Sequence, residues 1–120
     1  MLARVMHAFE GNPIDVSPAE AAQMLADGAV LIDVREPYER DAGFIGGSAH
    51  VELTRLAAAA ANVDREAPVI FYCRVGGRST MAAEAFRASG YDAYNLAGGI
   101  LAWVGAGMTL EPEGGRVADH

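Results

Sequence analysis

The sequence predicts an α/β domain in which a mostly parallel sheet of about five strands has helices on both faces. Short apolar runs typical of buried strands alternate with segments typical of helices along most of the chain. Such alternation favours parallel strands joined by helical crossovers. A length of 120 residues with 52% hydrophobic residues suits one domain with its own core. We therefore expect a single domain over residues 1–120, with its core at about 14–110 and a frayed tail at 111–120.

The clearest predicted element is a helix that follows a short strand at residues 14–16. Ser17 is a favourable N-cap, and Pro18 suits the first helical position. Glu20 stands three residues after Ser17 and completes a capping-box pattern. Gly28 is expected to end this helix.

The next elements are a buried strand and three shorter segments. Residues 29–34 form an apolar run broken only by Asp33, as expected for a strand covered on both faces. A short acidic helix is expected at 36–42, and glycines then mark a loop before a brief strand at 49–51. The alanine-rich stretch at 53–61 predicts a further helix.

The second half of the chain repeats the order of strand, loop and helix. Residues 68–72 predict another buried strand, and 73–78 a tight glycine-containing loop. Ser79 is expected to cap the helix that follows. Residues 93–96 predict the last strand, and two glycines separate it from a short final helix.

Composition and charge exclude several classes of protein. A formal net charge of -7 argues against a nucleic-acid partner, because phosphate binding needs a basic surface. No apolar run approaches the roughly 18 residues of a membrane span, and residues 1–13 lack the apolar core of a signal peptide. The single cysteine allows no internal disulfide, and a free thiol persists best in a reducing cytoplasm. We expect a soluble, cytoplasmic protein with no membrane partner.

One loop between a buried strand and a helix carries the candidate chemistry. Its residues are Cys73, Arg74, Val75, Gly76, Gly77, Arg78 and Ser79. The glycines allow successive N–H groups to point inward as an anion-binding nest, and the following helix adds its free N–H groups and dipole. With two arginines on the same loop, these features favour a thiolate and hold an anionic substrate beside the sulfur.

The plainer alternative is that Cys73 is a small buried hydrophobic residue, which is the commoner role of a lone cysteine after an apolar strand. A purely structural turn has no need for arginines on both sides of two glycines at the start of a helix. The loop composition therefore favours a functional cysteine.

Three motifs, in order, resemble the signatures of rhodanese-like sulfurtransferases. The pattern Cys-Arg-x-Gly-x-Arg-Ser at 73–79 resembles the active-site loop of that family. Leu-Ile-Asp-Val-Arg-Glu at 31–36, with the glycine-rich loop at 43–48, resembles its first signature. Leu-Ala-Gly-Gly-Ile-Leu-Ala-Trp at 96–103 resembles its carboxyl-terminal signature. The resemblance extends from about residue 14 to 103.

The resemblance implies a rhodanese-like three-layer α/β/α domain that moves sulfane sulfur through a persulfide on Cys73. The donor would be thiosulfate or a similar small anion, and the acceptor cyanide or a thiol. By position, substrate would be bound by the loop residues Arg74, Val75, Gly76, Gly77, Arg78 and Ser79. The two arginines would hold the anionic end of the donor, and Arg78 would also hold the loop in shape. The resemblance implies no cofactor.

The roles of Asp33 and Arg35 stay open at this point. In a fold of this type they lie beside the loop, where Arg35 would attract substrate. The same two side chains would equally form a structural ion pair or bond the loop backbone, because functional and structural charge networks look alike in a sequence.

Two positions depart from the family pattern. The first signature usually carries histidine where this chain has Phe44 and proline where it has Gly46. The loop at 43–48 is therefore expected to be less rigid than in the family, without loss of the nucleophile. The three histidines, at 7, 50 and 120, share no metal-ligand spacing with Cys73, so no metal site is expected.

Two alternative functions remain. A cysteine phosphatase or arsenate reductase has a similar loop with five residues between cysteine and arginine, but four lie between Cys73 and Arg78. This shorter loop favours transfer of a sulfur atom over that of a phosphoryl group. The other alternative is a binding module or a relay that passes persulfide between partner proteins with little turnover of thiosulfate.

Overall fold

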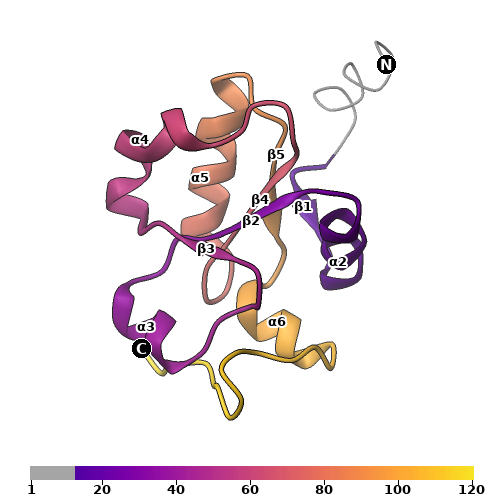
Figure 1. The fold of residues 1–120 in the computed structure, drawn as a ribbon, viewed down its shortest axis with the longest axis vertical. Coiled ribbons are helices and arrows are strands. Elements are labelled where there is room, and N and C mark those ends of the chain that lie inside the picture. The colour runs from indigo at the N-terminus through magenta and orange to yellow at the C-terminus, as the bar shows by residue number, and fades with distance from the viewer. Residues whose placement is uncertain (1–12) are drawn as a thin grey trace.

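Five parallel strands form one sheet in the order β1-β5-β4-β2-β3 (Figure 1). The structure is a computed structural model that describes residues 13–120. Residues 1–12, with His7 and most of the stretch expected to lack a signal peptide, lie outside the described part. The strands are β1 (Asp15–Val16), β2 (Val30–Asp33), β3 (Ala49–His50), β4 (Val69–Tyr72) and β5 (Ala93–Leu96). The predicted parallel sheet is confirmed.

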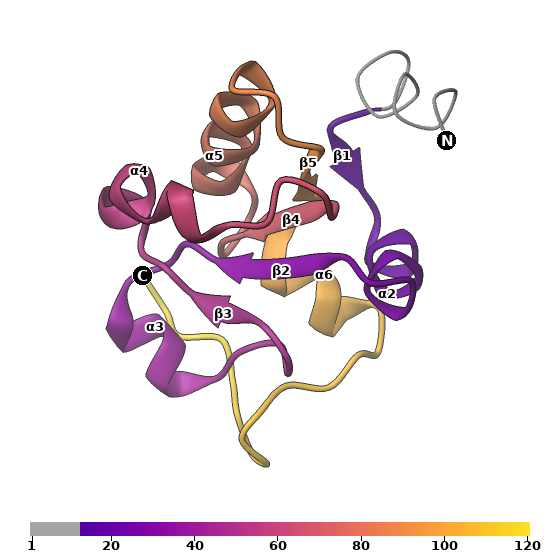
Figure 2. The ribbon, with the colours of Figure 1, turned by 45° about the horizontal axis from the view of Figure 1, so that its top comes forward.

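Helices cover both faces of this sheet. They are α2 (Pro18–Ala26), α3 (Pro37–Ala42), α4 (Leu56–Ala59), α5 (Gly77–Ala88) and α6 (Gly99–Gly105). On one face, side chains of α4 and α5 pack against β2 and β4. On the other, side chains of α2 and α6 pack against β2, β4 and β5 (Figure 2). The domain is therefore a three-layer α/β/α sandwich, as predicted.

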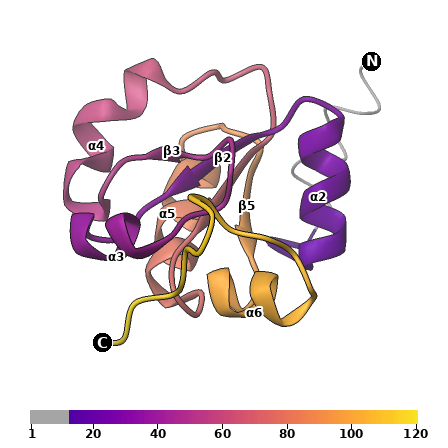
Figure 3. The same ribbon diagram turned by 60° about the horizontal axis from the view of Figure 1, so that its bottom comes forward.

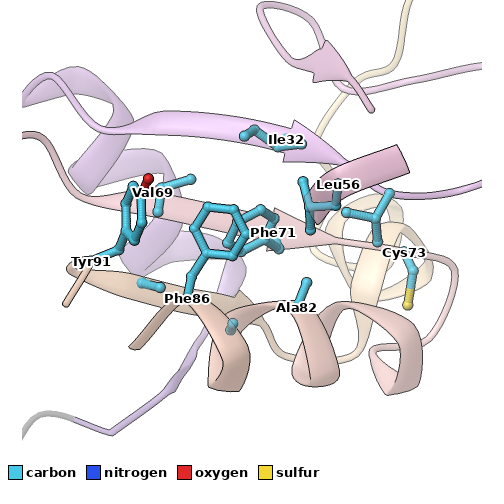
Figure 4. Packing of buried hydrophobic residues seen from close by; sticks show 11 residues of the cluster. Ile32, Leu56, Val69, Phe71, Cys73, Ala82, Phe86 and Tyr91 are labelled. Carbon is cyan, nitrogen blue, oxygen red and sulfur yellow. The ribbon is translucent and has the colours of Figure 1, made fainter. Parts of the chain in front are cut away.

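The alternation of side chains along β4 divides the core into two halves. Phe71 and Cys73 point to the face covered by α5, where Phe71 packs edge-on to Phe86 with ring centroids 4.8 Å apart. Ile70 and Tyr72 point to the opposite face. Figure 4 shows Cys73 at one end of the α5 half, beyond Ala82. The sulfur is thus held at the margin of a packed core.

The predicted start of α2 is confirmed in detail. Ser17 Oγ accepts the Glu20 N–H at 3.1 Å, and the Glu20 carboxylate accepts the Ser17 N–H at 2.8 Å. Pro18 occupies the first helical position. This reciprocal pair of bonds satisfies two of the N–H groups that a helix start leaves free.

The prediction of one regular helix at 53–61 is wrong, because the structure has three short helical segments there. The chain forms a 3-10 turn at Leu53–Arg55, a single α turn at α4 and a second 3-10 turn at Ala60–Asn62. Leu56 is the one buried side chain in these three segments. Helices this short are stabilised mainly by packing of an apolar face. With Leu56 as the one buried side chain, only a single α turn is stabilised.

The cap expected at Ser79 is also wrong. Helix α5 begins at Gly77, and Gly76 is its N-cap in a left-handed conformation. Because glycine adopts that conformation freely, the chain turns into the helix earlier than the serine pattern suggests. Ser79 therefore lies in the first turn, where its side chain is buried.

The tail expected to fray contacts the rest of the domain at several points between residues 111 and 120. Phe44 and Glu111 exchange two backbone hydrogen bonds of 2.8 Å, and the Arg116 N–H donates to Ala42 O at 2.8 Å. Figure 3 shows the tail running from the end of α6 past α3. Ala118 is 7% exposed. These backbone bonds to the loop after α3 hold a segment whose polar sequence suggested no structure.

Within the part of the chain that the structure describes, no helix is both long and apolar enough to cross a lipid bilayer.

Candidate functional site

Cys73 lies directly after the central strand β4, at the end of the sheet where the carboxyl ends of the parallel strands meet. The loop then turns back over the sulfur, and α5 begins within it. Gly76, with φ +117°, makes this turn in a conformation that most residues avoid. Its N–H consequently donates to Cys73 Sγ at 3.1 Å. The loop encloses the sulfur and leaves Cys73 1% exposed.

Burial raises the pKa of the Cys73 thiol, but hydrogen bonds to the sulfur outweigh it. They come from the Ser79 hydroxyl, whose Oγ is 3.3 Å from Sγ, and from the N–H groups of Ser79, Gly76 and Arg78. The net effect lowers the pKa of Cys73 below its ordinary value. The loop therefore favours the thiolate, which is the nucleophilic form.

Helix α6 supports the loop from the other side. The Ile100 N–H donates to Cys73 O at 2.9 Å, and the Leu101 N–H donates to Arg74 O at 3.2 Å. Gly99 permits this approach, because a Cβ there would lie 2.6 Å from Cys73 O. The supporting role of Gly99 was not predicted, although adjacent glycines before a helix are a signal of close backbone contact.

Arg78 forms a two-point ion pair with Glu39 of α3. Its Nη1 is 2.8 Å from Glu39 Oε1, and its Nη2 is 3.1 Å from Oε2. His120 of the tail also contacts this carboxylate, with Nε2 at 2.7 Å from Oε2. Glu39 is 1% exposed. The sequence analysis missed Glu39 and the contact of His120, and the one local signal was the capping position of Glu39 after Glu36.

Burial raises the pKa of Glu39, but hydrogen bonds from Arg78, His120 and the Glu36 N–H lower it to about 2. Since an unfolded glutamate has a pKa near 4.5, the ion pair stabilises the fold fully above that pH and progressively less as pH falls towards 2. We expect the stability difference between wild type and Glu39→Gln to shrink by about 2 kcal/mol between pH 6 and pH 3. Urea unfolding at pH 6, 4 and 3 measures it.

The matched control is Glu52→Gln, because Glu52 pairs with Arg55 at 3.6 Å on the surface. Glu52→Gln should change the free energy of unfolding by less than about 1 kcal/mol, because a surface ion pair contributes little. A difference for Glu39→Gln that does not change with pH would contradict the lowered pKa of Glu39.

Arg74 is the loop arginine that keeps its charge unpaired. Its Nε donates to the Ala118 backbone oxygen at 3.2 Å, and among residues 13–120 no carboxylate lies within ion-pair distance of it. Val75 at the tip of the loop is 57% exposed. The two arginines that look equivalent in the sequence are therefore different, because one is neutralised and the other is not.

Asp33 and Arg35 form a fully buried ion pair, each with 0% side-chain exposure. Arg35 Nε and Nη2 both donate to the Asp33 carboxylate at 2.8 Å. Arg35 Nη2 also donates to Gly43 O at 2.8 Å, and the Tyr72 hydroxyl donates to Asp33 at 3.2 Å. The sequence left open whether Asp33 and Arg35 attract substrate or form an ion pair within the fold. In the structure they form a buried ion pair.

His50 and His120 lie apart from one another. His50 is the last residue of β3, and its Nε2 is 2.7 Å from the Arg35 backbone oxygen. His120 contacts Glu39 instead. In the described region, no group of three histidine, cysteine or acidic side chains has the arrangement of a metal site.

Comparison with known proteins places these features in context. A family model described as "Rhodanese-like domain" matches residues 17–106. The chain is 35% identical over 89 residues to "Thiosulfate sulfurtransferase GlpE" of Pseudomonas aeruginosa (strain LESB58), a match that covers 73% of this chain and 81% of the relative.

Two solved structures have the same fold. A rhodanese-related protein from Thermoplasma volcanium superposes with a TM-score of 0.76 at 24% identity, over 82% of this chain and 97% of the other. A protein from Rhodopseudomonas palustris, described as of unknown function and a possible tyrosine phosphatase, superposes with a TM-score of 0.71 at 26% identity, over 92% of each chain. The family match over most of the domain shows that this chain belongs to the rhodanese-like domain family.

Proposed function

We propose that this protein is a sulfurtransferase that carries sulfur as a persulfide on Cys73. The donor is thiosulfate or a similar small anion, and the acceptor is cyanide or a thiol. The observation that carries the proposal is the ring of donors around Cys73 Sγ, which lowers the pKa of the thiol in spite of its burial. The sequence similarity to a thiosulfate sulfurtransferase supports this choice of donor. We place the reaction in the cytoplasm, where the single thiol stays reduced.

Transfer proceeds in two displacements at sulfur. The Cys73 thiolate attacks the sulfane sulfur of thiosulfate, a new S–S bond forms, and the old S–S bond breaks with its electron pair leaving on sulfite. The acceptor, as cyanide or as a thiolate, then attacks the outer sulfur, and Cys73 leaves as a thiolate. No proton acceptor is needed at either step, because the enzyme begins and ends as the thiolate. The loop N–H groups hold the negative charge throughout.

The phosphatase alternative fits this loop less well. A phosphoryl group needs the arginine of the loop as a ligand, but both terminal nitrogens of Arg78 bond Glu39. The loop is also one residue shorter than a phosphate loop. The persulfide-relay alternative uses the same chemistry, but partner proteins are both the donor and the acceptor, and thiosulfate is turned over poorly.

The first test is intact-protein mass spectrometry after incubation with thiosulfate, with and without cyanide. We expect wild-type protein to gain one sulfur atom, and cyanide to remove it with release of thiocyanate. If the reduced, folded protein gains no sulfur from thiosulfate, this donor is wrong. Persulfide donors and a phosphate ester would then separate a relay from a phosphatase.

Arg74→Ala is expected to raise the KM for thiosulfate by about tenfold, because the variant removes the loop cation that no carboxylate neutralises. Steady-state release of thiocyanate measures the effect. Arg55→Ala is the control, since the Arg55 side chain is 79% exposed and pairs with nearby Glu52. An unchanged KM in Arg74→Ala would place the anion site elsewhere.

A further inference from the structure

A chain of hydrogen bonds leads from the sulfur to the edge of the sheet. Ser79 Oγ lies 3.3 Å from Cys73 Sγ and 2.5 Å from Asn95 Oδ1. Asn95 Nδ2 then donates to Asp15 Oδ1 at 2.9 Å. Asp15 and Asn95 are partners in register on the neighbouring strands β1 and β5 (Figure 1). Ser79 and Asn95 are buried, whereas Asp15 is exposed.

The chemistry of these groups fixes the direction of each bond. An ionised carboxylate only accepts, so Asp15 requires the amide nitrogen of Asn95 to point towards it. The amide oxygen of Asn95 then faces Ser79, and that oxygen also only accepts. Ser79 must therefore supply the hydrogen of the short bond to Asn95.

Three acceptors compete for the single hydroxyl hydrogen of Ser79. They are Asn95 Oδ1 at 2.5 Å, Cys73 Sγ at 3.3 Å and the backbone oxygen of Gly76 at 3.3 Å. Ser79 lowers the pKa of Cys73 only while its hydrogen points to the sulfur. While Ser79 donates to Asn95, it offers lone pairs to the sulfur, which suits a thiol S–H and not a thiolate. The loop N–H groups, such as that of Gly76, donate to the sulfur in either case.

We propose that Asp15 is a positioning residue that holds the Ser79 hydrogen away from Cys73 by fixing the orientation of Asn95. Loss of the Asp15 charge allows the Asn95 amide to rotate and donate to Ser79 Oγ. The Ser79 hydrogen is then free to bond the sulfur and stabilise the thiolate. An exposed carboxylate at the sheet edge thus sets the reactivity of a buried sulfur. The inference rests on the proposed function for its catalytic consequence.

Other charged groups near the sulfur are not part of the hydrogen-bond chain from Ser79 to Asp15. Arg78 of α5 interacts electrostatically with Cys73 and forms an ion pair with Glu39 of α3, which His120 of the tail also contacts. Arg74 is in the loop itself and bonds the tail. None of these four side chains bonds Asn95 or Ser79 in the described structure. They form a constant background in the test below.

The test is a double-mutant cycle read from the titration of Cys73. Thiolate absorbance near 240 nm and the rate of alkylation by iodoacetamide, both as functions of pH, report on the thiol without any sulfur donor. We expect Asp15→Asn to lower the pKa of Cys73 by about 0.5 to 1 unit, since one more hydrogen bond reaches the thiolate. In the Ser79→Ala background, the same substitution should leave that pKa unchanged.

The cycle separates the effect of the hydrogen-bond chain from a simple charge effect. Removal of a negative charge at Asp15 would also lower the pKa of Cys73 through space, but equally in both backgrounds. Equal shifts in the two backgrounds, or no shift in either, would overturn the proposal. Asp27→Asn is the control, because Asp27 is exposed and accepts from the Gln23 amide at 3.3 Å without reaching the sulfur.

Two further points keep the test decisive. If Ser79→Ala fails to fold, Asn95→Ala breaks the same hydrogen-bond chain, and Asp15→Asn should leave the pKa of Cys73 unchanged in that background. A full shift there would overturn the proposal. Because the titration needs no sulfur donor, its result is independent of whether thiosulfate is turned over. A failed sulfur-transfer assay with an intact Asp15 effect would therefore contradict the proposed function alone.

Discussion

Cys73→Ser is expected to reduce sulfur transfer by at least about 10⁴-fold while the domain stays folded. A serine hydroxyl is not ionised at neutral pH and forms no persulfide, so both displacements are lost. The fold should survive because oxygen is slightly smaller than sulfur and the same groups, the Gly76 N–H and the Ser79 hydroxyl, can bond it. Thiocyanate release measures the loss, and circular dichroism with thermal unfolding measures the fold.

A chemical control is available because Cys73 is the one cysteine in the chain. Alkylation of wild type by iodoacetamide should remove activity in proportion to the fraction of protein modified. Cys73→Ser should gain no alkyl group under the conditions that modify the thiol of wild type. Appreciable transfer by the serine variant would mean that another group attacks the donor, and the persulfide mechanism would be wrong.

The sequence was sufficient where structure depends on neighbouring residues. The strand β4 occurs at Val69–Tyr72, within the predicted 68–72, because an apolar run of this length suits a buried strand. The capping box around Ser17 uses two residues three apart. The glycine-rich loop after Cys73 likewise forms from consecutive residues, so its approximate shape could be predicted.

The sequence was insufficient where a contact joins distant parts of the chain. Glu39 and Arg78 are 39 positions apart, and no local pattern says that the acidic helix meets this arginine. The tail is held by a bond between Arg116 and Ala42, which are also remote. Both cases depend on how helices and connections pack around the sheet, and packing is decided by the whole set of tertiary contacts.

Even within one motif, residue type did not settle the role. Arg74 and Arg78 look equivalent in the loop, but the structure pairs Arg78 with a buried carboxylate and leaves Arg74 without one. Asp33 and Arg35 show the same limit, because a buried ion pair and a substrate-binding pair have the same composition. Three-dimensional partners, and not residue identity, distinguish support from recognition.

Asp33→Asn is expected to lower the free energy of unfolding by about 3 to 5 kcal/mol. The variant leaves the Arg35 guanidinium, 0% exposed, without the carboxylate that accepts two of its hydrogen bonds. Such a loss is a large share of the stability of a domain this size, since folded domains are stable by about 5 to 15 kcal/mol. Urea unfolding at neutral pH measures the change.

The outcome also decides between the two roles considered for Asp33 and Arg35. Arg55→Ala is the control, because it breaks an exposed ion pair 3.6 Å long and should change stability by less than about 1 kcal/mol. If Asp33→Asn is as mild as this control but raises the KM for thiosulfate, the pair serves substrate attraction and its structural role is wrong. A large loss of stability, with a normal KM in the protein that remains folded, is the result we expect. It follows from the burial of both charges, which leaves them no route to a substrate in solution.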